Sequence, residues 1–320
     1  MADQGELMGA LDARARRRDE RREFFRASIG AAAFTMAGAT ALSFSAGANA
    51  QTVTDADVLN FALNLEYLEA QFYLFAVNGA GLAPNQLTGT GTQGAVTGGR
   101  QVSFSDPVIR DYAREIAADE LAHVVFLRQA LGAAAVAQPA INISGDADGA
   151  FTAAARAAGV VGPTETFDPY ADDISFLLGA YIFEDVGVTA YKGASPLITN
   201  KTFLEAAAGI LAVEAYHAAV VRTTLYARGV QTPSLRTAAD RISDARDSLD
   251  GTSDLDQGIS PTTVNGQLQS NIVPLDPNGL AFSRTTGQVL NIVYLNRAAA
   301  TMGGFFPAGV NGSIRASAAN

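Results

Sequence analysis

The 320-residue chain contains no cysteine, no tryptophan and only two histidines. Without cysteine it cannot form disulfides, bind metals through thiolates or use a thiol as a nucleophile. Any transition metal must therefore be bound by oxygen and imidazole ligands. Neither histidine has a serine or aspartate spaced to suggest a catalytic triad. The glycine pairs at 98–99 and 303–304 form neither a phosphate loop nor a dinucleotide fingerprint.

Basic residues are in the minority, with 22 against 32 acidic residues and a formal net charge of −10 at pH 7. This balance disfavours nucleic acids and anionic membranes as partners. After the first 50 residues no segment approaches 18 consecutive apolar residues, so we expect no stable membrane span once those residues are removed. The hydrophobic content of 48% suits a globular protein with a sizeable core.

Residues 1–50 have the pattern of an export signal. A basic stretch ending in RREFFR (21–26) precedes an apolar run from Ile29 to about Phe44, and an A-x-A cleavage pattern follows at 48–50. The run resembles the twin-arginine consensus, with Glu20 and Phe25 in place of the usual residues. We therefore expect a periplasmic or secreted protein that starts near residue 51. An ordinary secretory signal or an uncleaved anchor is the alternative.

Each of the two histidines, His123 and His217, follows a glutamate by three residues, Glu120 and Glu214 respectively. On a helix this spacing places a carboxylate and an imidazole on one face. Glutamate is rare enough in this chain that chance would give both pairs about once in a thousand cases. Two such pairs, with one glutamate from each of two further helices, form the ligand set of dinuclear sites in four-helix bundles.

The hydrophobic periodicity predicts an all-α fold built on four long helices. We expect them at about 54–77, 105–132, 172–191 and 201–227, within a bundle domain that spans residues 51–230. A capping-box-like start at Thr54 and a proline after Asp106 support the first two. A long crossover at 133–171, with a short helix near 149–158, would join the second helix to the third.

Residues 231–320 are expected to form a C-terminal extension. A fifth helix is predicted at 237–249, and the tail from Gly251 is rich in turn residues. One apolar stretch, 289–295, is compatible with either a short helix or a strand. The sequence assigns no function to this tail.

The remaining two glutamates are identified by a weak internal repeat. Glu66 is followed seven residues later by Tyr73, and Glu184 is followed seven residues later by Tyr191. Each of these helices precedes one that carries Glu-x-x-His. The order Glu, Glu-x-x-His, Glu, Glu-x-x-His therefore has pseudo-twofold symmetry.

A single glutamate on a helix is more often solvated than bound to a metal. Glu66 and Glu184, however, have apolar neighbours, and a buried carboxylate is costly unless it is paired or metal-bound. The helix of Glu184 has no basic residue before Lys192. We therefore predict six metal ligands around two Fe or two Mn ions, with Glu120 and Glu214 bridging them: Glu66, Glu120, His123, Glu184, Glu214 and His217.

Three further residues are candidates for roles beside the metals. Glu69 lies three residues after Glu66 and would be a neighbour of the ligands, a partner of an arginine or a ligand itself. Tyr73 and Tyr191 would hydrogen-bond an oxygen substrate or relay an electron, unless they are ordinary buried aromatics. Asp119 and Asp185 adjoin ligands but point about 100° away, so we expect them to be solvated or to contact the ligands.

The segments LEYLEAQFY (65–73), ADELAH (118–123) and AVEAYH (212–217) resemble the ferritin-like superfamily. Within it the chain is most similar to exported bacterial proteins related to plant desiccation-related proteins, and GGFFPAGVNG (303–312) resembles their C-terminal end. The resemblance covers about 54–228 well and implies a ferritin-like antiparallel four-helix bundle with a di-iron or di-manganese centre. The long loops and tail argue against a ferritin-type storage cage.

We accordingly expect an exported dinuclear Fe or Mn protein that reacts with dioxygen or hydrogen peroxide in oxidative or desiccation stress. Ferroxidase, peroxidase and catalase-like (manganese-catalase-like) reactions all remain open, as does a homo-oligomer. The alternative is a non-enzymatic protective protein whose metal site only stabilises the bundle.

Overall fold

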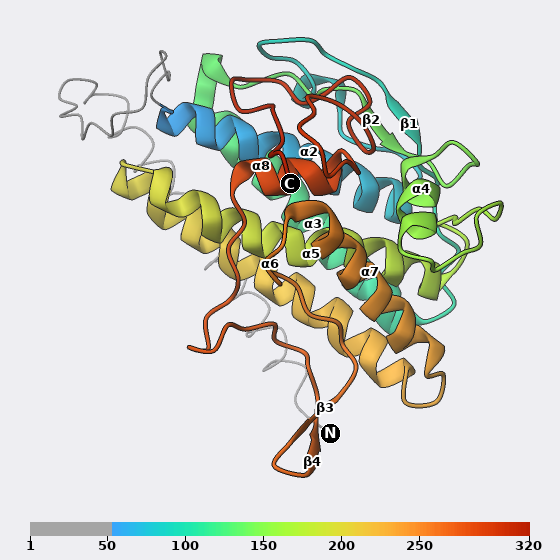
Figure 1. Ribbon diagram of the computed structural model, residues 1–320. Helices are drawn as coiled ribbons and strands as arrows, with labels where there is room; N and C mark the ends of the chain where they lie inside the picture. Colours follow the sequence, from blue (N-terminus) through green and yellow to red (C-terminus); the bar gives the residue numbers. More distant parts are fainter. Residues whose placement is uncertain (1–52) are drawn as a thin grey trace, which may run out of the picture. The chain divides into compact units, whose positions relative to one another are not determined.

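The computed structural model describes residues 53–320, and the predicted export signal lies outside the described residues. Four long helices dominate the described part, as Figure 1 shows: α2 (Asp55–Asn78), α3 (Pro107–Leu131), α5 (Asp173–Ala194) and α6 (Lys201–Arg228). The predicted all-α fold is confirmed, and each long helix lies within a few residues of its predicted range.

Local sequence signals explain where these helices begin and end. The Thr54 hydroxyl accepts a hydrogen bond from the Asp57 backbone, and the Asp57 carboxylate accepts one from the Thr54 backbone, which completes a capping box. Asp106 caps α3, and Pro107 occupies the first helical position, where its missing N–H costs little. Gly79 ends α2 with φ at 70°, a left-handed conformation that glycine adopts readily.

Contacts between the long helices show that neighbouring helices are antiparallel. Asp106, just before α3, forms an ion pair with Arg228 at the end of α6, whereas His123, further along α3, lies beside Glu214 in the middle of α6. The helices α5 and α6 are antiparallel in the same way, as are α2 and α3. Because α3 and α5 therefore run in the same direction, their connection must return along the length of the bundle.

This return is the predicted crossover, and it contains ordered structure. It includes the short 3-10 helix η2 (Gly132–Ala134), the strand β2 (Ile141–Ile143) and α4 (Ala150–Ala157), which is the short helix expected near 149–158. The strand β2 pairs in parallel with β1 (Val96–Gly98), from the long connection between α2 and α3. That connection also contains η1 (Pro84–Gln86). The two long connections thus support each other.

The C-terminal extension packs on the bundle. The fifth helix predicted at 237–249 is α7 (Ser234–Asp250), and the ambiguous apolar stretch is a helix, α8 (Thr286–Val293). Both contact α5, and the 3-10 helix η3 (Ser195–Leu197) joins α5 to α6. The antiparallel hairpin of β3 (Thr262–Val264) and β4 (Gln267–Gln269) projects from the body and is exposed (Figure 1).

An aromatic cluster joins these parts into one core. The Phe72 ring on α2 contacts Phe176 and Phe183 on α5, with ring centroids 5.6 and 5.7 Å apart. It also contacts Phe151 of α4 at 5.2 Å, and Phe305 from the C-terminal tail lies 4.9 Å from Phe183. The crossover and the tail therefore cover the bundle and contribute to its hydrophobic core.

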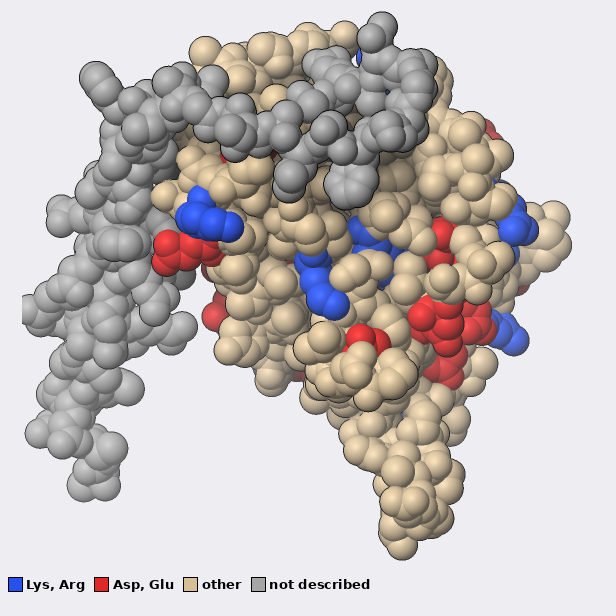
Figure 2. Space-filling view, turned by 60° about the vertical axis from the view of Figure 1, so that its left-hand side comes forward, with Lys and Arg blue, Asp and Glu red and all other residues tan. Residues whose placement is uncertain are grey.

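The helices α5 and α6 are long and apolar enough to cross a membrane by length and composition alone. The most apolar window of α5 is 83% buried inside the protein, while that of α6 is 33% buried. Core helices of soluble proteins pass the same test, so it is weak evidence for a span. Figure 2 shows charged side chains scattered over a largely uncharged surface on the face in view.

Candidate metal centre

The six predicted ligands meet in the middle of the bundle, and all are buried: Glu66, Glu120, His123, Glu184, Glu214 and His217. α2 and α5 contribute one glutamate each, and α3 and α6 each contribute a glutamate and a histidine. Their oxygen and nitrogen atoms form two overlapping groups that are close enough to hold a metal ion. The structure brings all six together, and their assignment as ligands stays a prediction.

The first group surrounds the imidazole of His123. Its Nδ1 atom lies 3.1 Å from Glu66 Oε2, 3.6 Å from Glu120 Oε2 and 3.7 Å from Glu214 Oε1. These four residues come from α2, α3 and α6. They offer three carboxylates and one imidazole, which is a donor set suited to a divalent first-row metal.

The second group surrounds the imidazole of His217. Its Nδ1 atom lies 3.0 Å from Glu120 Oε1 and 3.7 Å from Glu184 Oε2. Glu120 therefore directs one oxygen to each imidazole, and Glu214 also belongs to both groups. The two imidazole centroids are 6.4 Å apart. This arrangement has the form expected if Glu120 and Glu214 bridge two ions.

The polar atoms of this cluster point into a common space without satisfying one another. Among residues 53–320, eight buried side-chain polar atoms have no hydrogen-bond partner, and six of them belong to Glu120, Glu184, Glu214 and His217. His217 Nδ1 is one of these atoms, because its short contact with Glu120 does not have hydrogen-bond geometry. Unpaired buried polar groups are costly. The residues therefore fit metal ions, which would accept these lone pairs.

Burial and mutual repulsion change the protonation of the metal-free cluster. Burial, the largest cause, raises the pKa of Glu66 to about 7 and that of Glu184 to about 8. It also raises the pKa of Glu214 well above its ordinary value, with repulsion from Glu120 adding to the effect. Burial alone would lower the pKa of His217, but contacts with Asp119 and Glu120 outweigh it and raise the pKa to about 10.

The two candidate tyrosines connect the two halves of the cluster, one formed by α2 and α3 and the other by α5 and α6. The Tyr73 hydroxyl of α2 donates to Glu184 of α5, and the Tyr191 hydroxyl of α5 donates to Glu66 of α2. Both tyrosines are buried. Each hydroxyl therefore orients the glutamate that the opposite half does not share, Glu184 or Glu66. The tyrosine rings also fill space in the core, as ordinary buried aromatics would. A role in electron transfer stays a prediction.

Glu69 is buried beside the cluster, and no arginine pairs with it in the part of the chain that the structure describes. Burial and repulsion from Glu120 and Glu184 raise its pKa well above the ordinary value, which favours its protonated form. It is absent from both groups of candidate ligands. Of its three predicted roles, the one that the geometry supports is that of a neighbour of the ligands.

Gly187 is a site residue that the sequence analysis missed. A Cβ at this position would overlap Glu214 Oε2, so the missing side chain makes room for that carboxylate against α5. A glycine inside an apolar helix, three residues after a candidate ligand, was the available signal. This glycine indicates a site residue only when α5 and α6 are known to pack together, because the carboxylate that it accommodates belongs to α6.

The aspartates that adjoin ligands have different surroundings. Asp119 is half-buried, and its Oδ2 lies 3.4 Å from His217 Nε2. Of the two predicted surroundings for Asp119, solvent or a candidate ligand, the structure therefore shows contact with a ligand. Asp185 is buried and faces away from the cluster, where it pairs with Arg222 at 2.8 Å and Arg246 at 2.9 Å. The prediction that Asp185 is solvated or contacts the ligands is wrong, because the C-terminal extension covers that side of α5.

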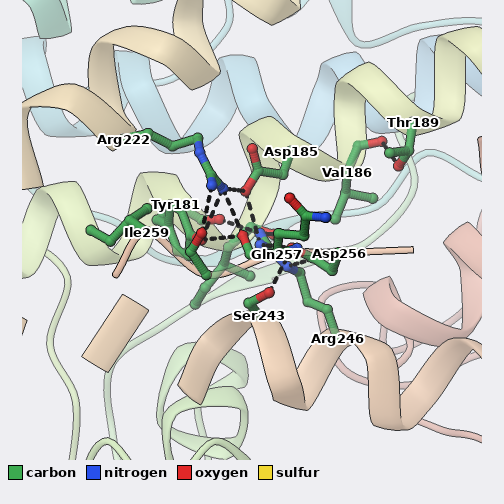
Figure 3. A network of polar contacts seen from close by, with 12 residues as sticks. Tyr181, Asp185, Val186, Thr189, Arg222, Ser243, Arg246, Asp256, Gln257 and Ile259 are labelled. Atoms are coloured by element: carbon green, nitrogen blue, oxygen red, sulfur yellow. Dashed lines mark hydrogen bonds and ion pairs between the residues drawn. The ribbon is translucent and has the colours of Figure 1, made fainter. Parts of the chain in front are cut away.

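Asp185 belongs to a buried network that we call the arginine network: Asp185, Asp250, Asp256, Arg222, Arg246 and Arg284. Figure 3 shows the part around Asp185, Asp256 and Arg246. Asp256 joins Arg246 at 2.6 Å and Arg284 at 3.1 Å, and Asp250 joins Arg284 at 2.5 Å. Arg222 also donates to backbone carbonyls of the extension, including that of Gly258. The network therefore fastens the extension, including α7, to α5 and α6.

Comparison with known proteins agrees with this geometry. A family model described as a ferritin-like domain matches residues 54–227. A ferritin-like catalase of Nesocodon mauritianus is 32% identical over 271 residues, which cover 81% of this chain and 84% of that protein. A desiccation-related protein of Craterostigma plantagineum is 33% identical over 248 residues, covering 74% of this chain and 76% of that protein. The resemblance to the ferritin-like superfamily and to desiccation-related proteins is thereby confirmed.

Proposed function

Because the chain belongs to the ferritin-like family, we propose that it is a dinuclear Fe or Mn protein that reacts with hydrogen peroxide or dioxygen. The observation that carries this proposal is the set of six buried candidate ligands from four helices, which have no lysine or arginine partner among residues 53–320 and several of whose side-chain atoms are unpaired. Two bound Fe or Mn ions supply a centre that exchanges two electrons with an oxygen substrate.

The chain's own residues hold and shape this centre. Glu120 and Glu214 are placed between the two imidazoles, while Glu66 and Glu184 are fixed by the tyrosine hydroxyls of the opposite helices. Glu69 is a further buried carboxyl beside the cluster, and its raised pKa favours the protonated form. The apolar walls of the bundle keep bulk water away from all of these groups.

Among the three reactions, a catalase-like one has the support of the relative named ferritin-like catalase. In that reaction two molecules of hydrogen peroxide give one dioxygen and two waters, so no external reductant is required. A ferroxidase would instead consume added Fe(II), and a peroxidase would require an added reductant. We propose a periplasmic or secreted location, in line with the sequence of residues 1–50.

The test is the reaction of metal-loaded protein with peroxide. Protein loaded with Mn or Fe should release dioxygen without added reductant, and Glu120→Ala should lose this activity. Glu205→Ala, which removes an exposed glutamate of α6, is the matched control and should behave as the unmodified chain does. Loss of activity in neither variant, or in both, would contradict the assignment of Glu120.

The second candidate function is protective rather than enzymatic, and the relative named as desiccation-related favours it. Bound metal would then only stabilise the bundle. In that case metal removal would lower the melting temperature, yet loaded protein would consume neither peroxide nor Fe(II) faster than Glu120→Ala.

A further inference from the structure

The candidate site is built from two halves related by pseudo-twofold symmetry. One half is α2 with α3, and the other is α5 with α6. The tyrosine contacts are exchanged between halves, since Tyr73 reaches Glu184 and Tyr191 reaches Glu66. The histidine contacts are also repeated, because each Nδ1 atom faces the glutamate of its own half and the shared Glu120.

The ligand groups of the two halves are therefore equivalent in number. Each ion position would receive one histidine, one unshared glutamate, and oxygens from the shared Glu120 and Glu214. No difference between the positions follows from the ligands themselves. Any difference must come from the residues that touch the ligands.

The symmetry is broken at the residue that precedes each Glu-x-x-His glutamate. On α3 this residue is Asp119, whose carboxylate lies 3.4 Å from Nε2 of His217. On α6 the corresponding residue is Val213, which is half-buried and offers no acceptor. Among residues 53–320, no acceptor is found for Nε2 of His123. One imidazole has a carboxylate behind it, and the other does not.

A carboxylate behind a metal-binding imidazole has a known physical effect. It accepts a hydrogen bond from the N–H group of the outer nitrogen, so it fixes the tautomer in which the inner nitrogen keeps its lone pair. It also makes that lone pair a stronger donor and restrains rotation of the ring. Removing such a partner typically weakens metal binding about 10- to 100-fold.

We propose that the two metal positions are inequivalent, and that the position of His217 and Glu184 binds its ion more tightly because Asp119 supports His217. This inference rests on the proposed dinuclear site. Asp119 is then a positioning residue. The metal position at His123 has the weaker affinity because Val213, at the corresponding place on α6, offers no acceptor. The first ion to bind therefore occupies the half formed by α5 and α6.

The experiment is a titration of chelator-treated full-length protein with Mn(II), followed by calorimetry and by electron paramagnetic resonance. Two binding steps are expected, with dissociation constants that differ at least about tenfold. At one equivalent the spectrum should be that of isolated Mn(II), and coupling between two ions should develop only as the second equivalent binds. Two steps of equal affinity would overturn the inference.

Variants identify the residue that is responsible. Asp119→Ala should weaken the tighter step about 10- to 100-fold and leave the other step unchanged. Asp111→Ala, an exposed aspartate on the same helix, is the control and should change neither step. Val213→Asp should tighten the weaker step. Equal weakening of both steps by Asp119→Ala, or no weakening, would overturn the role of Asp119.

These outcomes separate the inference from the proposed function. If the unmodified protein binds no Mn(II) or Fe(II), the dinuclear function itself fails. If it binds two ions with equal affinity, only the inequivalence fails. Circular dichroism confirms that each variant is folded, and Asp119 is half-exposed, so its replacement should be tolerated.

Discussion

Two buried clusters of charge lie on different sides of α5, and they differ in how their charge is balanced. Glu184 points into the candidate metal centre, while the next residue, Asp185, points into the arginine network. In the arginine network three aspartates meet three arginines. In the candidate centre, five buried glutamates share two histidines, and no lysine or arginine within the described residues pairs with them.

This difference separates a structural cluster from a binding site. Charges buried in a protein are tolerated when they are paired and hydrogen-bonded. The arginine network pairs every charge with an opposite charge of the same chain, although Arg246 Nε and Asp250 Oδ1 lack a hydrogen-bond partner, and it joins the extension to the bundle. The candidate centre does not pair its charges in this way, which is the physical reason to expect cations there. The two clusters should therefore respond in opposite ways when a charge is removed.

The largest effect on stability is expected from breaking the arginine network. Arg246→Met leaves Asp185 and Asp256 without a shared partner, so the free energy of unfolding should fall by about 3–5 kcal/mol. Urea unfolding measures this change. Arg315→Met removes an exposed arginine and is the control. A loss below about 1 kcal/mol, the range of an exposed ion pair, would show that the network is not structural.

The opposite sign is expected when a charge is removed from the candidate centre of metal-free protein. Burial raises the pKa of Glu184 to about 8, so ionisation favours the unfolded state. Glu184→Gln should therefore raise the free energy of unfolding at pH 7, by up to about 3 kcal/mol at 1.4 kcal/mol per pKa unit. Chelator-treated protein unfolded in urea provides the measurement. Destabilisation by this variant would mean that the negative charge of Glu184 is already neutralised by groups of the protein itself.

The same imbalance predicts a pH dependence. The raised pKa values of Glu66, about 7, and Glu184, about 8, mean that the folded metal-free protein binds more protons than the unfolded chain above pH 4.5. Its stability should fall as pH rises from 5 to 8, by about 1.4 kcal/mol per pH unit for each extra proton. The lowered pKa of Glu120, caused by the histidines despite its burial, acts in the opposite direction only below about pH 4.5, outside this range.

Bound metal should reverse this trend. Since metal ions displace protons from their ligands, binding tightens as pH rises, and stabilisation by Mn(II) should be larger at pH 8 than at pH 5.5. Thermal melts with and without Mn(II) at both values measure this difference. Equal stabilisation at the two pH values would argue against carboxylate and imidazole ligands.

The smallest effect is expected at the tyrosines. Tyr191→Phe leaves Glu66 without its hydroxyl donor and should cost about 1–2 kcal/mol of stability in the metal-free protein. It should also change the electronic absorption of iron-loaded protein, because the Glu66 carboxylate is no longer held. Tyr112→Phe, at a partly exposed position on α3, is the control. Unchanged absorption in Tyr191→Phe would contradict contact between Glu66 and the metal.

The sequence predicted the bundle well because its signals are local. Helical periodicity, the cap at Thr54 and the spacing of His123 and His217 all act within one helix. The internal repeat also gave Glu66 and Glu184, since burial of a lone glutamate in an apolar helix requires compensation. These features do not depend on which helices pack together.

The features that the sequence did not reveal depend on long-range packing. Asp185 was expected to be solvated or to contact the ligands because it points about 100° away from Glu184. It pairs instead with Arg246, which comes from a helix more than 60 positions later. Gly187 has a role only because Glu214 of α6 lies against it. The apolar stretch 289–295 has no periodicity of its own that separates helix from strand, and as α8 it packs on α5.

The central claim is that the buried glutamates and histidines bind two metal cations, because no lysine or arginine of the described residues neutralises their charge. The most direct measurement is the metal content of protein reconstituted with Mn(II) or Fe(II) and then freed of excess metal. The account predicts two ions per chain, falling to one or none in Glu120→Ala and His217→Ala. Substoichiometric metal that these substitutions leave unchanged would contradict it.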